Sequence, residues 1–109
     1  MRGYLELVDE NRLFWIVFVE FWGEMMHDPE LMRFNAALYR RFRRTLGALV
    51  LKGVRTGRFR RVDPDEAGAI ILALIDGVAL QRTFDARAFT RDRARQFCED
   101  AVMRYLRKA

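Results

Sequence analysis

The sequence predicts an all-α fold, and three of its features support that prediction. Apolar residues recur at intervals of three and four over most of the chain, which is the period of an amphipathic helix. Both prolines follow an aspartate, in Asp28-Pro29 and Asp63-Pro64, and this pairing is typical of helix starts. The sequence shows no period-2 strand pattern bounded by turn signals. Its 109 residues suit one domain with one core.

Four helices are expected, the first from about Asp9 or Asn11 to His27, and the others at about 29–56, 64–84 and 91–107. An aspartate caps the free N–H groups of a first turn, and a proline there has no N–H to leave unpaired. Glu66, three residues after Asp63, gives that start an Asp version of the capping box. Gly57 fits a helix end because glycine adopts the left-handed conformation without strain. Thr90 is expected as an N-cap.

Composition points to a cytoplasmic protein. The longest candidate for membrane insertion, residues 13–19, is closed by Glu20 and is far shorter than the roughly 20 residues that span a bilayer, so no membrane partner is expected. The first ten residues do not have the pattern of a signal peptide. Cys98 is the only cysteine and cannot form an internal disulfide. The net charge of +5 is a weak indication of an acidic partner, because nearly all the excess is arginine.

Two of the expected helices are amphipathic. The apolar face of the 29–56 helix holds Leu31, Phe34, Leu38, Phe42, Leu46, Leu49 and Gly53. That of the last helix holds Ala94, Phe97, Cys98, Ala101, Val102, Tyr105 and Leu106.

The other two helices are apolar nearly all round. The stretch LFWIVFVEFW in the first helix must be central, or it must face an absent segment or a partner. The 64–84 helix is apolar from Ala67 to Leu80 except for Asp76. An unpaired buried carboxylate is very unfavourable, so Asp76 needs a partner or the solvent edge, and several arginines are candidates.

Small side chains form a narrow stripe on the 64–84 helix. Ala69, Ala73 and Gly77 are spaced at i, i+4 and i+8, which would let another helix approach closely. Gly77 costs about 1 kcal/mol of helix propensity relative to alanine, a cost that is tolerated if a larger side chain would clash. The stripe therefore predicts close helix packing, including packing against a second subunit.

Three segments in this order resemble a known family: FWGEMMHDPEL, LYRRFRRTLGALVLKGVRTGRF and VDPDEAGAIILALIDGVALQ. Their most specific parts are the Gly53-x-x-x-Gly57-x-Phe59 spacing, the Asp63-Pro64 start, and Ile75-Asp76-Gly77 followed by Leu80-Gln81. Over about residues 9–107 the chain resembles the C-terminal domain of tetracycline-repressor-like (TetR) regulators, and most of all the branch of the choline-responsive betaine regulator.

The resemblance implies a four-helix C-terminal domain of the tetracycline-repressor type at residues 9–109, with residues 1–8 a junction or the end of a preceding helix. Members of the family are homodimers. Their C-terminal helices form an effector pocket, and the last two pair between subunits. An N-terminal helix-turn-helix reads the operator in such regulators. The sequence contains no such unit, so this chain alone is not expected to read operator DNA.

Residues are expected at two sites. An apolar effector pocket would be lined by Trp15, Phe18, Trp22, Met25, Phe34, Asn35, Leu38 and Phe42. Core packing is the competing interpretation for the aromatic residues, and local hydrogen bonding is the competing one for Asn35. A dimer interface would be formed by Ala69, Ala73, Asp76, Gly77, Leu80, Phe97, Ala101 and Tyr105.

Other chemistry has little support in the sequence. His27 is the only histidine, so no metal site is expected, and Cys98 fits a small buried hydrophobe. Glu20 and Glu24, one turn apart, fit a solvated helix edge better than an acid/base pair. The 40–44 arginine run is split between helix faces and fits a solvated surface better than a phosphate track. No catalytic or cofactor motif is present, so neither an enzyme nor a cofactor is expected.

Two hypotheses on function follow. The first is an effector-binding and dimerisation domain of a TetR-like repressor that senses a small, largely apolar ligand. The alternative is a stand-alone dimeric helical module that pairs with a full-length relative and modulates its DNA binding.

Overall fold

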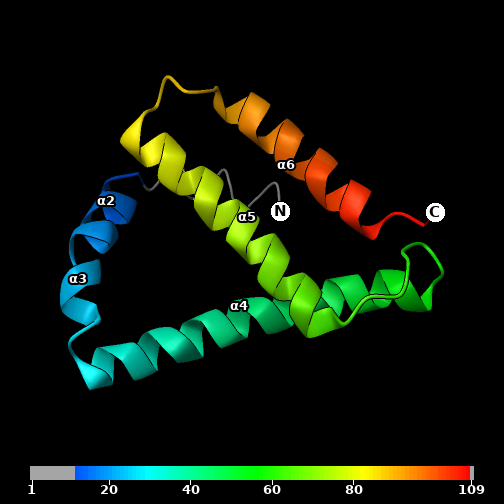
Figure 1. Cartoon of the computed structure of the whole chain (residues 1–109), viewed down its shortest axis with the longest axis horizontal. Coiled ribbons are helices and arrows are strands. Elements are labelled where there is room, and N and C mark those ends of the chain that lie inside the picture. Colours follow the sequence, from blue (N-terminus) through cyan, green and yellow to red (C-terminus); the bar gives the residue numbers. More distant parts are fainter. Residues whose placement is uncertain (1–11, 109) are drawn as a thin grey trace.

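The computed structural model describes residues 12–108, and these residues confirm the all-α prediction. Five helices follow one another: α2 (Arg12–Glu20), α3 (Trp22–Met25), α4 (Pro29–Arg55), α5 (Pro64–Phe84) and α6 (Arg91–Leu106) (Figure 1). The last three lie within two residues of their predicted bounds. The predicted start of the first helix at Asp9 or Asn11, and the junction at residues 1–8, fall outside the described residues.

The three helix starts that the sequence marked are capped as expected. Asp28 Oδ1 accepts hydrogen bonds from two N–H groups of the first turn of α4, at 3.0 and 3.3 Å. Asp63 Oδ1 lies 3.2 Å from the backbone nitrogen of Asp65, at the start of α5. Thr90 Oγ1 lies 3.1 Å from the nitrogen of Arg93, at the start of α6. These bonds satisfy N–H groups that have no partner within the helix.

The prediction of a single first helix is wrong. The segment is interrupted at Phe21 and forms two helices, α2 and α3. Phe21 lies between α2 and α3 with φ −82° and ψ −4°. Backbone hydrogen bonds from Phe21 N to Val17 O (3.1 Å) and from Met25 N to Phe21 O (3.0 Å) still connect the two pieces. The change in ψ accounts for the break, and Gly23, a poor helix former, lies in the short second piece.

The centre of the fold is α5, which crosses α4 and has α6 along its other side (Figure 1). The most extensive contact is between α4 and α5. Three helices supply the buried core, namely Val50 from α4, Ala67, Ile71, Ile75 and Val78 from α5, and Ala94, Cys98 and Leu106 from α6. The over-apolar first segment is therefore not central. It lies at the edge, where Leu13 is 75% exposed and Phe21 is 52% exposed.

The buried face of α4 is rotated from the predicted one. Gly47 and Val50, neither of them on the predicted stripe, are buried, whereas Phe34 and Leu49 are 69% and 62% exposed. Because α5 crosses α4 near Gly47, it covers that side of the helix and leaves Leu49 exposed. Gly53, which is on the predicted stripe, is also buried. The stripe on α6 is confirmed apart from Ala101, which is exposed.

Two glycines set how closely α4 and α5 approach. A methyl group added at Gly47 would lie 2.7 Å from the carbonyl oxygen of Pro64. One added at Gly68 would overlap the carbonyl oxygen of Arg43. Backbone therefore meets backbone at both points of the crossing. The close approach that the sequence assigned to the Ala69 stripe is made within the subunit by Gly68 instead.

The Gly53-x-x-x-Gly57-x-Phe59 spacing ends α4 and turns the chain toward α5. The N–H of Arg58 bonds to the carbonyl of Gly53 (2.9 Å), and that of Gly57 bonds to the carbonyl of Val54 (3.1 Å). This is the Schellman pattern, and Gly57 has the positive φ of +78° that it requires. The Phe59 ring then lies directly on Gly53, where any side chain would overlap it.

By length and composition alone, α5 could cross a membrane. Its position argues for a core helix instead, because it carries seven of the buried residues and packs between α4 and α6.

We expect Gly68→Ala to lower the free energy of unfolding by roughly 1–3 kcal/mol, because the new methyl group overpacks the α4–α5 crossing. Urea denaturation at fixed protein concentration measures it. Gly23→Ala is the matched control, since a methyl group there meets nothing within 4 Å. It should leave stability unchanged or raise it by up to about 1 kcal/mol. Equal effects of the two substitutions would contradict a close contact at Gly68.

Candidate functional site

Five of the residues predicted to line a ligand pocket are half-buried, on α2, α3 and α4: Phe18, Met25, Asn35, Leu38 and Phe42. Among the described helices, α3 contacts α4, and α2 contacts α3 and α5. Trp22 is 36% exposed. Phe34, at 69% exposed, is not enclosed with them. The side chain of Trp15 falls outside the described part of the structure.

Polar contacts cross between helices among these apolar residues. The hydroxyl of Tyr39 donates a 2.8 Å hydrogen bond to Oδ2 of Asp76, joining α4 to α5. The amide of Asn35, one turn before Tyr39, lies 3.8 Å from the sulfur of Met25, on α3. Tyr39 also packs edge-on against Phe42, with ring centroids 6.4 Å apart. These two polar contacts join α4 to α5 and α4 to α3.

Asp76 was expected at the dimer interface, with an arginine as a candidate partner. Within the subunit it is half-buried and bonds to a tyrosine of the neighbouring helix. Sequence reasoning missed Tyr39, which lies beside the predicted stripe of α4. Its position four residues after Asn35 was the available signal, because residues so spaced share a helix face.

The surroundings of Tyr39 favour its protonated form. Burial raises the pKa of Tyr39 well above its ordinary value of 10.0, and the hydrogen bond to Asp76 and the negative charge of that carboxylate raise it further. The phenol therefore keeps its proton, and its bond to Asp76, throughout the neutral range.

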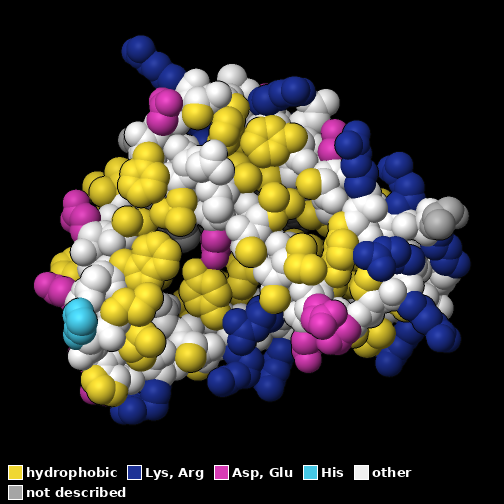
Figure 2. All heavy atoms as spheres, in the orientation of Figure 1, with side chains coloured by type: hydrophobic (Ala, Val, Ile, Leu, Met, Phe, Trp, Pro, Cys, Tyr) yellow, Lys and Arg dark blue, Asp and Glu magenta, His cyan; other side chains and the backbone are white. Residues whose placement is uncertain are grey.

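Exposed apolar side chains lie along the same part of the chain. They come from α2, α3 and the first half of α4, and comprise Leu13, Val17, Phe21, Trp22, Met26, Leu31, Met32 and Phe34. Figure 2 shows hydrophobic side chains gathered over these helices, on a face that is hollowed between them and α5. Contiguous apolar surface of this kind is typical of a binding site or an interface.

The predicted dimer residues form a second surface. On α5, Ala69 and Ala73 are exposed, and a methyl group added at Gly77 would meet nothing within 4 Å. Leu80 is half-buried, and beside the stripe Ile70 is 48% exposed. On α6, Ala101 is exposed, whereas Phe97 and Tyr105 are half-buried against the core. The small stripe of α5 is therefore not filled by another described helix of the subunit.

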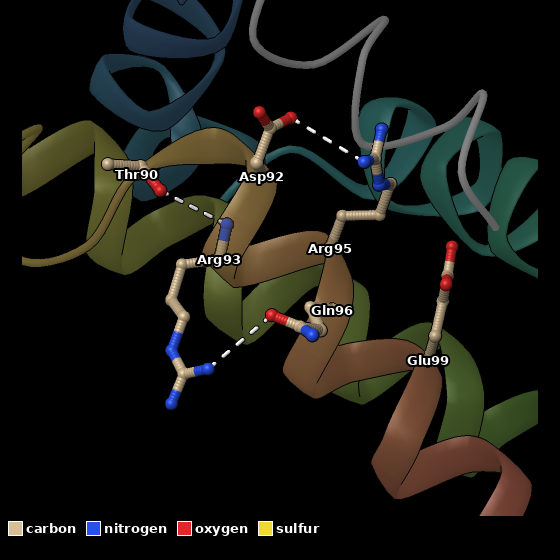
Figure 3. A pocket seen from close by; sticks show the side chains of 6 residues that line it. All are labelled: Thr90, Asp92, Arg93, Arg95, Gln96 and Glu99. Carbon is tan, nitrogen blue, oxygen red and sulfur yellow. Dashed lines mark hydrogen bonds and ion pairs between the residues drawn. The ribbon is translucent and has the colours of Figure 1, made fainter.

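A hollow of about 470 Å³ lies elsewhere, along α6 (Figure 3). Its lining residues are Thr90, Asp92, Arg93, Arg95, Gln96 and Glu99. All of them come from α6 and its N-cap, and Arg95 pairs with Asp92 at 3.6 Å. The hollow is polar and open to solvent, and it is separate from the apolar residues predicted to bind a ligand.

The described residues offer no group of three or more histidine, cysteine or acidic side chains that could hold a metal ion. Cys98 is buried, as expected for a small hydrophobe. Burial raises the pKa of its thiol, and the charge of Glu99 raises it further, so the thiol stays protonated and unreactive at neutral pH.

The fold and the sequence together define a regulatory domain of the TetR type. The family model for the C-terminal domain of the BetI-type transcriptional repressor matches residues 1–107, and the chain belongs to that family. No curated protein and no solved structure matches the chain.

Tyr39→Phe tests the contact between α4 and α5. We expect it to lower stability near pH 7 by about 1.5–3 kcal/mol, since it removes a hydrogen bond to a carboxylate. The wild-type protein should also lose stability above about pH 10, where the unfolded chain releases the phenolic proton that the folded state retains. The Phe variant has no phenolic proton at position 39, so its stability should decline less steeply as the pH rises. Urea denaturation from pH 7 to 11 measures both effects, and parallel curves would contradict the bond.

Proposed function

We propose that this domain binds a small, largely apolar effector and forms a homodimer within a transcriptional repressor. The family match over residues 1–107 carries the proposal, because the matched domain is the C-terminal part of a repressor. The exposed apolar surface over α2, α3 and α4 supports it, since effector pockets are lined mainly by apolar and aromatic side chains.

The effector would lie where α2 and α3 meet α4 and α5. Phe18, Leu38 and Phe42 would contact its apolar part, and all three are only half-buried in the subunit. Asn35 and the Tyr39–Asp76 pair supply the polar groups that would fix its orientation.

The dimer would form through α5 and α6. Exposed Ala69, Ala73 and Ala101 leave room for the backbone of a partner helix to come close, and Gly77 leaves the most. Ile70 would add apolar area beside them.

The Tyr39–Asp76 bond connects the two surfaces. It joins α4, which carries effector residues, to α5, which carries dimer residues. An effector that favours one arrangement of these helices would shift the repressor toward that arrangement. Operator binding by the DNA-reading unit of the repressor would thereby weaken. The domain itself would act in the cytoplasm, without catalysis, and would not read an operator sequence.

Gly77→Leu tests the interface. We expect it to convert the dimer to monomer, because overpacking a close helix contact is destabilising by roughly 1–3 kcal/mol or more. Sedimentation equilibrium reports the mass. Gly23→Leu is the control, at a glycine with similar free space but on α3. A Gly77→Leu variant that stays dimeric with an unchanged melting temperature would show that this face is not the interface.

Native mass spectrometry of the purified chain tests effector binding. We expect a dimer that carries a small-molecule adduct, and we expect Phe42→Ala to lose the adduct because part of the pocket wall is removed. Phe84→Ala is the control, since Phe84 is 77% exposed at the end of α5. Isothermal titration against a broad metabolite panel covers the case in which purification removes the effector. Absence of any binder in both measurements would count against the pocket.

A further inference from the structure

A cluster of basic side chains lies at the end of the molecule away from α2 and α3. It consists of Arg55, Arg58, Arg60, Arg61, Arg107 and Lys108, which we call the basic corner. All six side chains are exposed. Figure 2 shows Lys and Arg gathered where α4 ends and the C-terminus lies, opposite the apolar surface. Neither the effector site nor the dimer face uses these residues.

Two segments far apart in the sequence form the corner, and their backbones are joined. The backbone nitrogen of Arg60 donates to the carbonyl of Leu106 at 2.9 Å, and Phe59 forms an isolated antiparallel bridge with Arg107. The side chain of Arg60 donates from Nε to the carbonyl of Tyr105 at 2.6 Å, and its guanidinium lies 4.8 Å from the centre of the Tyr105 ring. The loop after α4 is thereby held against the end of α6.

The loop is also fixed internally. The Schellman turn at Gly57 and the Phe59 ring on Gly53 set its path, and the guanidinium of Arg58 lies over the Phe59 ring at 5.5 Å from its centre. Because folding already orders these residues, less conformational entropy is lost when a partner binds them.

The charge of the corner is not neutralised within the described chain. None of the six side chains forms an ion pair with another residue among 12–108. Acidic residues do follow nearby, namely Asp63, Asp65 and Glu66 at the start of α5, and Asp63 is occupied in capping that helix. Six positive charges against three leave the corner clearly positive.

We propose that the basic corner binds the phosphate backbone of duplex DNA without regard to sequence. Five of the six residues are arginine, whose planar guanidinium can bind phosphate through two parallel hydrogen bonds. Arg60 uses Nε for Tyr105 and keeps its other donors available.

DNA fits the corner better than an anionic bilayer does. Peripheral membrane binding combines basic residues with apolar side chains that enter the lipid. The exposed large hydrophobic residues lie outside the corner, over α2, α3 and the first half of α4, and singly at Leu49, Ile70 and Phe84. A repressor is also held near DNA by its reading unit, so even a weak second contact would form at high local concentration.

Fluorescence anisotropy with a labelled duplex of about 20 base pairs and arbitrary sequence tests the proposal. We expect binding at about 50 mM salt that weakens steeply as salt is added, because each phosphate contact releases a counterion. The variant R55Q/R61Q/K108Q should bind about tenfold or more weakly, and its salt slope should fall by ~0.9 for each phosphate that the variant no longer neutralises. Arg58 and Arg60 are left unchanged because they support the loop.

The control variant R33Q/R87Q/R93Q removes three exposed charges elsewhere, so the two variants have equal net charge. It should bind within about twofold of wild type. If both variants lost DNA affinity equally, net charge alone would explain the loss, and the proposal would be overturned. Absence of DNA binding in the wild-type protein, or tighter binding to vesicles rich in phosphatidylglycerol than to the duplex, would also overturn it. Effector binding and dimer mass, measured on the same samples, show separately whether the proposed function holds.

Discussion

The close crossing of α4 and α5 is the contact on which the rest of the structure depends. Gly47 meets the carbonyl of Pro64, and Gly68 meets the carbonyl of Arg43, so the helices touch through their backbones. This proximity places Val50 against the buried face of α5 and brings Tyr39 within 2.8 Å of Asp76. The same helix, α5, then presents its small residues on a different side. One element therefore serves the core, the candidate effector site and the candidate dimer face.

The polar pair at Tyr39 and Asp76 explains a residue that looks out of place in an apolar helix. A half-buried carboxylate would be unfavourable without hydrogen bonds, and the phenol supplies one. Because the pair joins α4 to α5, it is also a direct physical connection between the proposed effector site and the proposed dimer face. The surface near α3 is apolar, which suits an apolar effector. The surface of α5 carries small side chains, which suits a partner helix.

Much of this could be predicted from local sequence patterns. The caps at Asp28, Asp63 and Thr90 and the turn at Gly57 depend on interactions within a few residues, so their chemistry is readable along the chain. The exposure of Phe34 was not readable, because it depends on which neighbours lie beside the helix. Likewise, Tyr39 lies at the edge of its predicted stripe, and only the direction of α5 shows that it faces Asp76.

The sequence by itself therefore determined the helical class, the ends of the long helices and the family, all of which follow from residue types at short spacing. Tertiary structure alone decided which glycine makes the close contact, which face of α4 is buried, and which partner Asp76 meets. It also brought Arg58 and Arg60 beside the last residues of the chain. The physical reason is that helix periodicity gives a side chain its angle about its own axis, whereas burial and pairing depend on how two axes cross.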